Sequence, residues 1–450
     1  MQALPAGSCM SNTHRLIKGT IILTGAGFLC RFLGFFYRIY LSRQFTEENI
    51  GIYQLLTPLC ALVFAITSAG LQTAISKFVA ATSQNDQNKA VRILTAGGTA
   101  SLSLALILMF PLYCCSDKIA VLFLKEARTA PLIRLFALSI PFAGIHACIN
   151  GFFYGFQKTG LPALSQLLEQ CIRILTLTVL CESILRQSMT PLIQVAAVGM
   201  ITSEAASALL SLFYLYRYIM KHRIPVCFPD TKEFVAIIKE LFGMAWPLTA
   251  SRIVITLLLG LEASYLPEMI MRFGGSRADA LGAYGIMTGM ALPLILFPSA
   301  ITNSISVLLL PMISEAEEQH KNNTIVAATR RSIKYCCLWG SICFLGFYFL
   351  GPPVAGLLFD NTDAGAYVRS LSFICPFLYL SSTTGSILHG LGRTRITFIS
   401  QLASLAVRLA FVFLLIPGFG INAYFSGLLT SELVLCMCYL LALRKYMYYT

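Results

Sequence analysis

Apolar runs of about 20 residues follow one another along almost the whole sequence, and they constrain the fold more than any other feature. Runs of this length can cross the hydrocarbon core of a bilayer as helices. They lack the alternation of apolar and polar residues that marks the strands of a membrane barrel. Hydrophobic residues make up 57% of the chain and charged residues only 12%, so a water-soluble core could not absorb the apolar surface. The sequence therefore predicts an all-α, polytopic membrane protein.

The apolar runs predict twelve membrane-spanning helices, joined mostly by short connections. Their expected positions are residues 19–42, 52–78, 92–114, 131–156, 161–183, 191–216, 240–267, 281–311, 325–350, 366–391, 395–416 and 422–443. Cytoplasmic connections of such proteins carry an excess of Lys and Arg. With both termini placed in the cytoplasm, most Lys and Arg outside the spans fall in the inner segments. We therefore expect a multi-pass protein of the cytoplasmic membrane with both termini inside the cell.

The two halves of the chain repeat one another. The stretch that begins at Pro141 aligns without gaps over forty residues with the stretch that begins at Pro376, with nine identities. The tripeptide Thr-Ser-Glu then recurs at residues 202–204 and 430–432. Because each half holds an even number of predicted helices, the two halves should have the same orientation in the membrane.

This parallel repeat predicts two six-helix lobes, residues 1–220 and 240–450, with a cytoplasmic linker at 221–239 between them. Two such lobes around a central cavity are an architecture of transporters. A duplicated structural bundle that transports nothing is the alternative interpretation.

Several charged residues fall inside the predicted spans, where each should face protein or a wet cavity because a charge at the bilayer centre costs about 2.5–3.5 kcal/mol. Arg173 and Glu204 lie at similar depth in a predicted helix hairpin, and Arg408 and Glu432 repeat them in the second half. Pairing is the least costly way to bury either charge. We therefore expect two structural ion pairs, Arg173–Glu204 and Arg408–Glu432.

Glu169 breaks the symmetry of the halves, because its counterpart in the repeat is Ser404. It stands four residues before Arg173 and could share this arginine. It is also a candidate for a protonatable residue that couples transport to an ion. Glu262 is the second candidate for such a coupling residue.

Arg31 and Arg252 each lie thirteen residues after a lysine that marks the cytoplasmic start of the first helix of a half. At about 1.5 Å per residue, both should lie about 20 Å into the membrane. Arg38 follows Arg31 on the same helix face. The planar guanidinium group matches phosphate and keeps its proton, so these arginines predict a ladder of positive charge in a cavity between the halves. Pairing with Glu262 or with backbone carbonyls is the alternative.

Polar residues also form stripes on the second and eighth predicted helices, with Gln72 and Asn303 among them. Such residues can contact a substrate or can simply pack membrane helices against each other, and both interpretations remain open.

The sequence shows no P-loop, no acid-pair motif and no metal-ligand spacing, and its five histidines are scattered. We therefore expect no enzyme, no cofactor and no metal. The net charge of +13 is spread over connections without a compact patch, so it needs no nucleic acid. A membrane-embedded glycosyltransferase would need a clustered acid or His site on a loop, and the sequence shows none. A scaffold that transports nothing remains an alternative.

Several stretches resemble the stage V sporulation protein B family, and the likeness runs along essentially the whole chain. They are "KGTIIL" from Lys18, "RFLGFFYR" from Arg31, "EENIGIYQLLTP" from Glu47, "SQLLEQCIRI" from Ser165, "TASRI" from Thr249 and "PMISEAEEQ" from Pro311. This family belongs to the multidrug/oligosaccharidyl-lipid/polysaccharide exporter superfamily and is related to lipid II flippases. The resemblance implies a V-shaped fold of two six-helix lobes and transport by alternating access.

The resemblance also implies roles for individual residues. In lipid II flippases an arginine before "LGF" contributes to the cavity, and here it is Arg31. Their second arginine comes six residues later, where this chain has Tyr37, with Arg38 one position further on. Arg252 matches a cavity charge of the seventh helix.

The resemblance and the arginines together favour a flippase that carries an undecaprenyl-diphosphate-linked saccharide outward across the cytoplasmic membrane. The resemblance implies a lipid II-like precursor of peptidoglycan, used for the spore cortex, with the lipid bilayer and cell-wall synthesis proteins as partners. The alternative is a cation-coupled multidrug exporter of the same superfamily, although cationic drugs would favour unpaired carboxylates rather than arginines.

Overall fold

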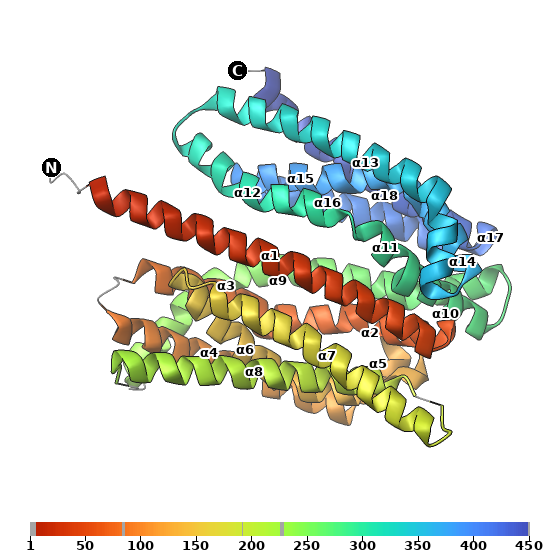
Figure 1. Ribbon diagram of the computed structural model, residues 1–450, viewed down its shortest axis with the longest axis horizontal. Coiled ribbons are helices and arrows are strands. Elements are labelled where there is room, and N and C mark those ends of the chain that lie inside the picture. The colour runs from red at the N-terminus through yellow and green to blue at the C-terminus, as the bar shows by residue number, and fades with distance from the viewer. Residues whose placement is uncertain (1–5, 83–85, 191, 226–228, 449–450) are drawn as a thin grey trace. The chain divides into compact units, whose positions relative to one another are not determined.

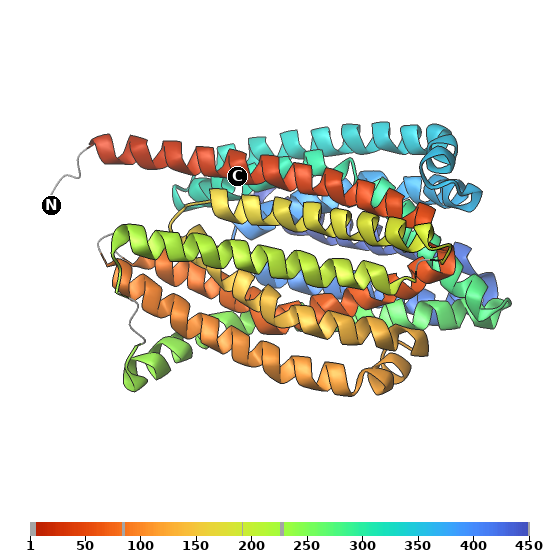
Figure 2. The same cartoon turned by 60° about the horizontal axis from the view of Figure 1, so that its bottom comes forward.

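The computed structural model is built from helices, as the sequence predicts (Figures 1 and 2). It describes residues 6–82, 86–190, 192–225 and 229–448, with side chains described from residue 22 to residue 444. The chain ends at residues 1–5 and 449–450, which are predicted to be cytoplasmic, lie outside the described residues.

The chain forms two compact units, which we describe separately. Unit 1 comprises residues 1–33 and 56–257, and unit 2 comprises residues 34–55 and 258–450. Three helices contribute residues to both units, namely α1 (Ala6–Gln44), α2 (Glu47–Phe64) and α9 (Thr231–Phe273). Compared with the halves predicted from the repeat, residues 34–55 therefore belong to the second unit and residues 240–257 to the first.

Unit 1 is a helical bundle in which α6 makes much of the packing. Its other elements are η1 (Ala65–Ala69), α3 (Gly70–Ala81), α4 (Gln87–Cys114), α5 (Ser116–Leu122), η2 (Ala127–Thr129), α6 (Ala130–Gly155), α7 (Gly160–Arg186) and α8 (Gln194–His222). Helix α6 packs against α3, α4 and α8, and α7 lies along α8 (Figure 1). At Gly151 a Cβ atom would lie 2.6 Å from the carbonyl oxygen of Gln72, so only glycine allows α6 this close to α3.

Unit 2 is organised around α15. Its other elements are α10 (Arg277–Gly285), η3 (Ile286–Ala291), α11 (Leu292–Leu296), α12 (Ser299–Glu318), α13 (Asn322–Phe359), α14 (Thr362–Leu371), η4 (Ser372–Ile374), α15 (Cys375–Gly390), α16 (Thr394–Ala410), η5 (Phe411–Leu415), α17 (Ile416–Phe419) and α18 (Ile421–Tyr448). Helix α15 packs against α12, α13 and α18, and α16 packs against α18. The start of α2 meets α10 through Gly51 and Gly285, where Cβ atoms would lie 2.1 and 2.2 Å from backbone oxygens of the facing helix.

The second and eighth predicted helices are interrupted at equivalent places. In the first half the interruption is the π-helical turn η1, which contains Ser68. In the second half it is the break before Ser299, where Pro298 cannot donate to the preceding turn. When Tyr53 is aligned with Tyr284, Ser68 falls opposite Ser299. The repeat therefore extends to this one break, whereas the π-helical turn η3 (Ile286–Ala291) falls opposite the regular helix α2.

Twelve helical stretches of the described chain are long and apolar enough to cross a membrane, which confirms the predicted number. The set differs from the predicted one in two places. The predicted span 281–311 is divided into Arg277–Leu296 and Ser299–Glu318. The predicted span 161–183 is helical as α7, which is not among the twelve.

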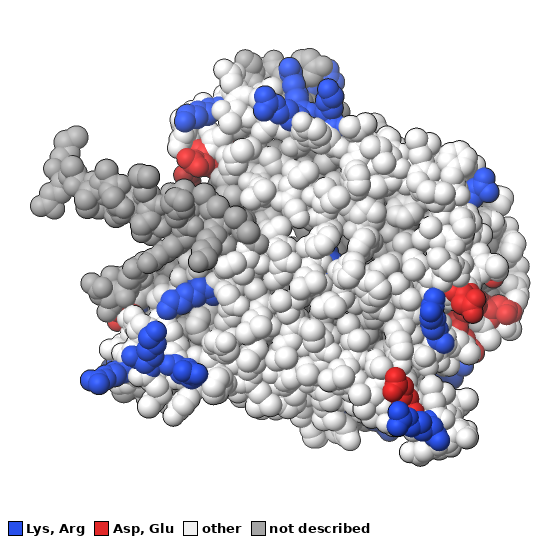
Figure 3. All heavy atoms as spheres, viewed as in Figure 1, with Lys and Arg blue, Asp and Glu red and all other residues white. Residues whose placement is uncertain are grey.

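Charged side chains are sparse along the middle of the long helices. On the face shown in Figure 3, Lys, Arg, Asp and Glu gather toward the helix ends, and uncharged residues cover the stretches between them. This distribution is expected of helices that cross hydrocarbon. The charges that lie at mid-helix are therefore the candidates for function.

Candidate functional site

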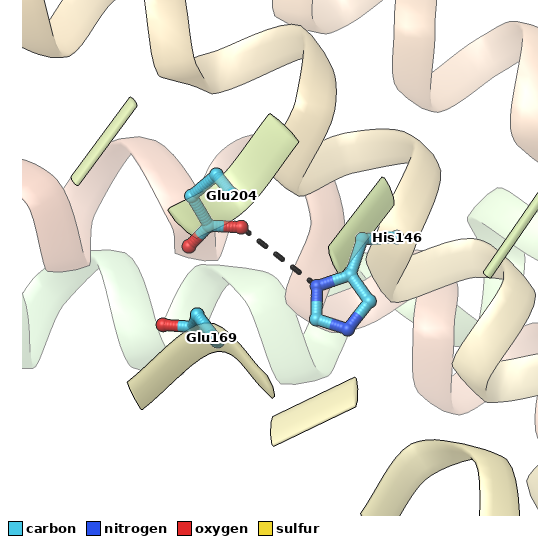
Figure 4. Close-up of side chains that lie close together, drawn as sticks. All are labelled: His146, Glu169 and Glu204. Atoms are coloured by element: carbon cyan, nitrogen blue, oxygen red, sulfur yellow. Dashed lines mark ion pairs between the residues drawn. The ribbon is translucent and has the colours of Figure 1, made fainter. Parts of the chain in front are cut away.

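A cluster of charged and polar side chains lies inside unit 1, between α6, α7 and α8 (Figure 4). Arg173 Nη2 lies 2.5 Å from Glu169 Oε1, one turn away on the same helix. His146 Nδ1 lies 3.7 Å from Glu204 Oε2. These four side chains are at most one-fifth exposed, so the protein removes most of their contact with the surroundings.

The imidazole of His146 is held through its other nitrogen. His146 Nε2 lies 2.7 Å from Asn150 Nδ2 and 3.1 Å from Ser165 Oγ. Asn150 comes from the next turn of α6, and Ser165 donates its own hydroxyl to the carbonyl oxygen of Pro162 in α7. The hydrogen bond that Asn150 Nδ2 donates to Nε2 orients the ring so that Nδ1 faces the carboxylate of Glu204 (Figure 4).

The cluster has a formal charge that one positive charge would balance. Donor atoms of His146, Glu169 and Glu204 all lie within 4.8 Å of one another, a spacing at which an ion could be held. The two carboxylates and the guanidinium of Arg173 sum to one negative charge when His146 is neutral. A divalent metal ion would leave a buried positive charge, so these residues suit a single monovalent charge better.

Unit 2 holds a second cluster at repeat-related positions. Arg408 Nη2 lies 2.7 Å from Glu262 Oε2, and the hydroxyl of Tyr424 donates to Glu262 Oε1 at 2.5 Å. Ser381 Oγ donates to Glu432 Oε2 at 3.1 Å. In the repeat, Ser381 is the counterpart of His146. Ser381 lies beside Glu432 as His146 lies beside Glu204, so both units have a polar residue next to the repeated glutamate.

Both arginines have partners that differ from the predicted ion pairs. In place of Arg173–Glu204 the structure shows Arg173–Glu169, and in place of Arg408–Glu432 it shows Arg408–Glu262. Each arginine reaches a carboxylate that the other half lacks. Glu169 lies one turn before Arg173, and Glu262 comes from α9 within unit 2. The sharing of Arg173 by Glu169 that the sequence suggested is present, and Glu262 binds Arg408 rather than the predicted arginine ladder.

The three arginines of the predicted ladder do not share one environment. Arg31 in α1 and Arg252 in α9 are exposed, and both belong to unit 1. Arg38 belongs to unit 2, where its Nη1 donates to the carbonyl oxygen of Thr288 at 3.1 Å. Thr288 lies in the π-helical turn η3, whose altered hydrogen bonding makes carbonyl groups available to side chains. Arg38 therefore follows the alternative to the charge ladder, in which an arginine pairs with a backbone carbonyl.

Arg43, which follows Arg38 in the same helix, also binds a helix in unit 2. Its guanidinium donates to the carbonyl oxygens of Leu357 and Leu358 at 2.9 and 3.1 Å, at the end of α13. Positive charge is favourable at a helix C-terminus. Arg43 thus has a structural contact that its exposure alone does not reveal.

Gln72 and Asn303, the two polar residues predicted to bind substrate, lie in different surroundings. Gln72 is half-buried in α3 of unit 1. Asn303 in α12 accepts a hydrogen bond from Ser382 at 2.8 Å and donates to Ser299 at 3.3 Å. The bond with Ser382 connects α12 to α15, so the helix-packing interpretation applies to Asn303.

Sequence reasoning missed His146, Asn150, Ser165 and Tyr424. His146 and Asn150 are four residues apart and so lie on one face of a helix. The forty-residue repeat starts at Pro141 and contains His146, Asn150 and Ser165, so its alignment places His146 opposite Ser381. A polar pair on one face of an apolar helix was therefore the available signal.

Two units built from membrane-length helices define the fold of a polytopic membrane protein. The solved lipid II flippase MurJ in an inward closed conformation has this fold, with a TM-score of 0.72, 15% sequence identity and coverage of 94% of this chain and 87% of that chain. A multidrug resistance MATE family transporter of the MOP superfamily, in an inward-facing conformation, has a TM-score of 0.68 at 16% identity, covering 92% of this chain and 94% of that chain.

The sequence comparisons identify the family. The polysaccharide biosynthesis protein family matches residues 16–317, and the chain belongs to this family. Stage V sporulation protein B of Bacillus subtilis (strain 168) is 28% identical over 446 residues, which cover 95% of this chain and 83% of that protein. Lipid II flippase MurJ of the same organism is 24% identical over 419 residues, 88% of this chain and 76% of that protein. The protein is thus a MOP-superfamily transporter related to both.

Proposed function

We propose that this protein is a flippase that carries an undecaprenyl-diphosphate-linked saccharide from the cytoplasmic to the outer face of the cell membrane. The saccharide would be a lipid II-like peptidoglycan precursor, used in the spore cortex. The names of two relatives support this substrate class, since one is a lipid II flippase and the other a sporulation protein. Both chain termini would lie in the cytoplasm, as the distribution of Lys and Arg favours.

The observation that carries the proposal is the exposure of Arg31 and Arg252. The buried Arg173 and Arg408 contact carboxylates, and Arg38 contacts a backbone carbonyl. Arg31 and Arg252 instead expose their side chains on repeat-related helices of unit 1, where the sequence spacing places both near the middle of the membrane. An exposed guanidinium at this depth suits the diphosphate of a lipid-linked saccharide, because it offers several donors and keeps its charge.

The test is a flipping assay with purified protein in liposomes that contain a labelled undecaprenyl-diphosphate-linked saccharide. Arg31→Ala and Arg252→Ala should each abolish transport without reducing membrane insertion, since removing a midplane charge eases insertion. Arg186→Ala is the matched control, because Arg186 is exposed at the end of α7 and should leave transport unchanged. Full activity in either midplane variant would contradict the role given to these arginines.

A cation-coupled multidrug exporter is the second candidate. Glu169 and Glu204 in unit 1 favour it, since carboxylates inside a membrane protein can bind a cationic drug or a coupling ion. Native mass spectrometry with lipid-linked saccharides and cationic dyes separates the candidates. Retention of the dye and not of the lipid would support the exporter.

A further inference from the structure

A small cavity opens at one end of unit 1, where α3 ends and where α4 and α9 begin. Its volume is about 110 Å³, which is room for a small group and not for a whole lipid. Its floor is apolar, because Ile93 and Leu241 belong to the buried core of the unit, and Phe78 and Ile237 pack against this core. The described residues that line it include none of those predicted to bind the transported substrate.

Two charged side chains of opposite sign line the cavity, Lys89 from α4 and Glu240 from α9. Both residues are exposed, and among the described residues no ion pair joins them. Neighbouring charges of the same two helices already contact each other, because Arg92 Nη1 lies 2.9 Å from Glu233 Oε2. Lys89 and Glu240 are therefore available to a ligand that carries one charge of each sign.

The position of the cavity along α9 corresponds to the headgroup layer of a membrane. The predicted span 240–267 begins at Glu240. Trp246, six residues or about 9 Å further along α9, is 65% exposed, and tryptophan is enriched at the interface between a membrane and water. A lipid can therefore reach the cavity with its headgroup while its acyl chains stay in the bilayer. In the orientation predicted from Lys and Arg, this is the cytoplasmic leaflet.

The two opposite charges discriminate between lipid headgroups. Phosphatidylethanolamine carries a phosphate for Lys89 and a primary ammonium for Glu240, and the two carbon atoms between these groups can cover the apolar floor. An anionic headgroup such as phosphatidylglycerol would satisfy Lys89 but would place its charge near the carboxylate of Glu240. The diphosphate of a lipid-linked saccharide would meet the same repulsion.

We propose that this cavity binds the headgroup of phosphatidylethanolamine, with Lys89 on the phosphate and Glu240 on the ammonium group. The bound lipid joins the ends of α3, α4 and α9, two of which, α4 and α9, are also connected by the Arg92–Glu233 ion pair. This site goes beyond the proposed transport function and does not depend on it.

Native mass spectrometry of the full-length protein tests the site, with dimyristoyl phosphatidylethanolamine and dimyristoyl phosphatidylglycerol added at equal concentrations. These lipids have the same acyl chains and differ only in the headgroup. The unsubstituted protein should prefer the phosphatidylethanolamine. Lys89→Ala and Glu240→Ala should each weaken its binding about tenfold, as expected for the loss of one charge-assisted hydrogen bond. The reversed pair, Lys89→Glu with Glu240→Lys, should restore the preference.

Glu240→Lys alone gives the sharpest comparison. Two lysines in the cavity should shift the preference toward phosphatidylglycerol by about tenfold, and a gain of binding cannot come from an unfolded protein. Glu318→Lys is the matched control, because it makes the same charge change at an exposed glutamate at the end of α12 in unit 2. This control should leave the preference unchanged.

Three results would overturn the proposal. The unsubstituted protein could retain both lipids equally, or Glu240→Lys could leave the preference as it is. Soluble glycerophosphoethanolamine could displace the lipid at an equal concentration, which would make the cavity a site for a water-soluble zwitterion. None of these measurements involves flipping, so the proposed function can fail while the lipid site stands, and the reverse also holds.

Discussion

Single residues in this protein show that an intramembrane charge has to be interpreted together with its partner. Arg408 is only 16% exposed and Glu262 only 6%, and Tyr424 adds a hydrogen bond to the same carboxylate. Removing one member of such a pair leaves the other charge buried and uncompensated. Replacing both members by apolar residues of similar volume removes the charge altogether.

We therefore expect Arg408→Leu to destabilise unit 2 by about 3–5 kcal/mol, because Glu262 would keep its buried charge. The double variant Arg408→Leu with Glu262→Leu should recover much of this loss. Thermal unfolding of both variants in nanodiscs measures the difference. A double variant that unfolds at a lower temperature than Arg408→Leu alone would contradict this account of the pair.

The residue scale also shows the limit of prediction from sequence. The positions of Arg173, Arg408, Glu204 and Glu432 in the repeat were clear, but the repeat could not identify their partners. Identical positions in two halves predict identical pairs, and the actual partners are residues at which the halves differ, Glu169 and Glu262. The choice between carboxylates depends on side-chain geometry, which the sequence spacing of helices leaves open.

Whole elements of this fold depend on close helix contacts and on irregular turns. In unit 2, Gly285 at the end of α10 lies directly against the backbone of Glu47 at the start of α2. The two helices can come this close because Gly285 has no side chain. The π-helical turn η3 in turn provides the carbonyl group of Thr288 that Arg38 binds. The sequence predicted the long helices from their apolar runs, but a π-helical turn has no comparable pattern, so the partner of Arg38 could not be predicted.

Gly285→Ala should destabilise the protein by about 1–3 kcal/mol, because its Cβ atom would lie 2.2 Å from the backbone oxygen of Glu47 and force the helices apart. Gly346→Ala in α13 is the control, since its Cβ atom would meet no atom within 4 Å. Alanine there should be neutral or slightly stabilising, because it has the higher helix propensity. Equal melting temperatures of the two variants would show that the α2–α10 contact tolerates a side chain.

At the scale of the whole molecule, membrane-length helices and an exposed arginine on each of two repeat-related helices suit the transport of an anion. Moving one unit charge across 100 mV is worth about 2.3 kcal/mol, and the cell interior is negative. The outward movement of a diphosphate headgroup is therefore favoured by the potential.

The most direct measurement is the flipping of a labelled undecaprenyl-diphosphate-linked saccharide in proteoliposomes with an imposed potassium-diffusion potential and equal pH on both sides. We expect movement of the label away from the negative side, at a rate that increases with the potential and is lost in Arg31→Ala and Arg252→Ala. Movement of a cationic dye, with no movement of the lipid-linked saccharide at any potential, would contradict the flippase and leave the multidrug exporter in its place.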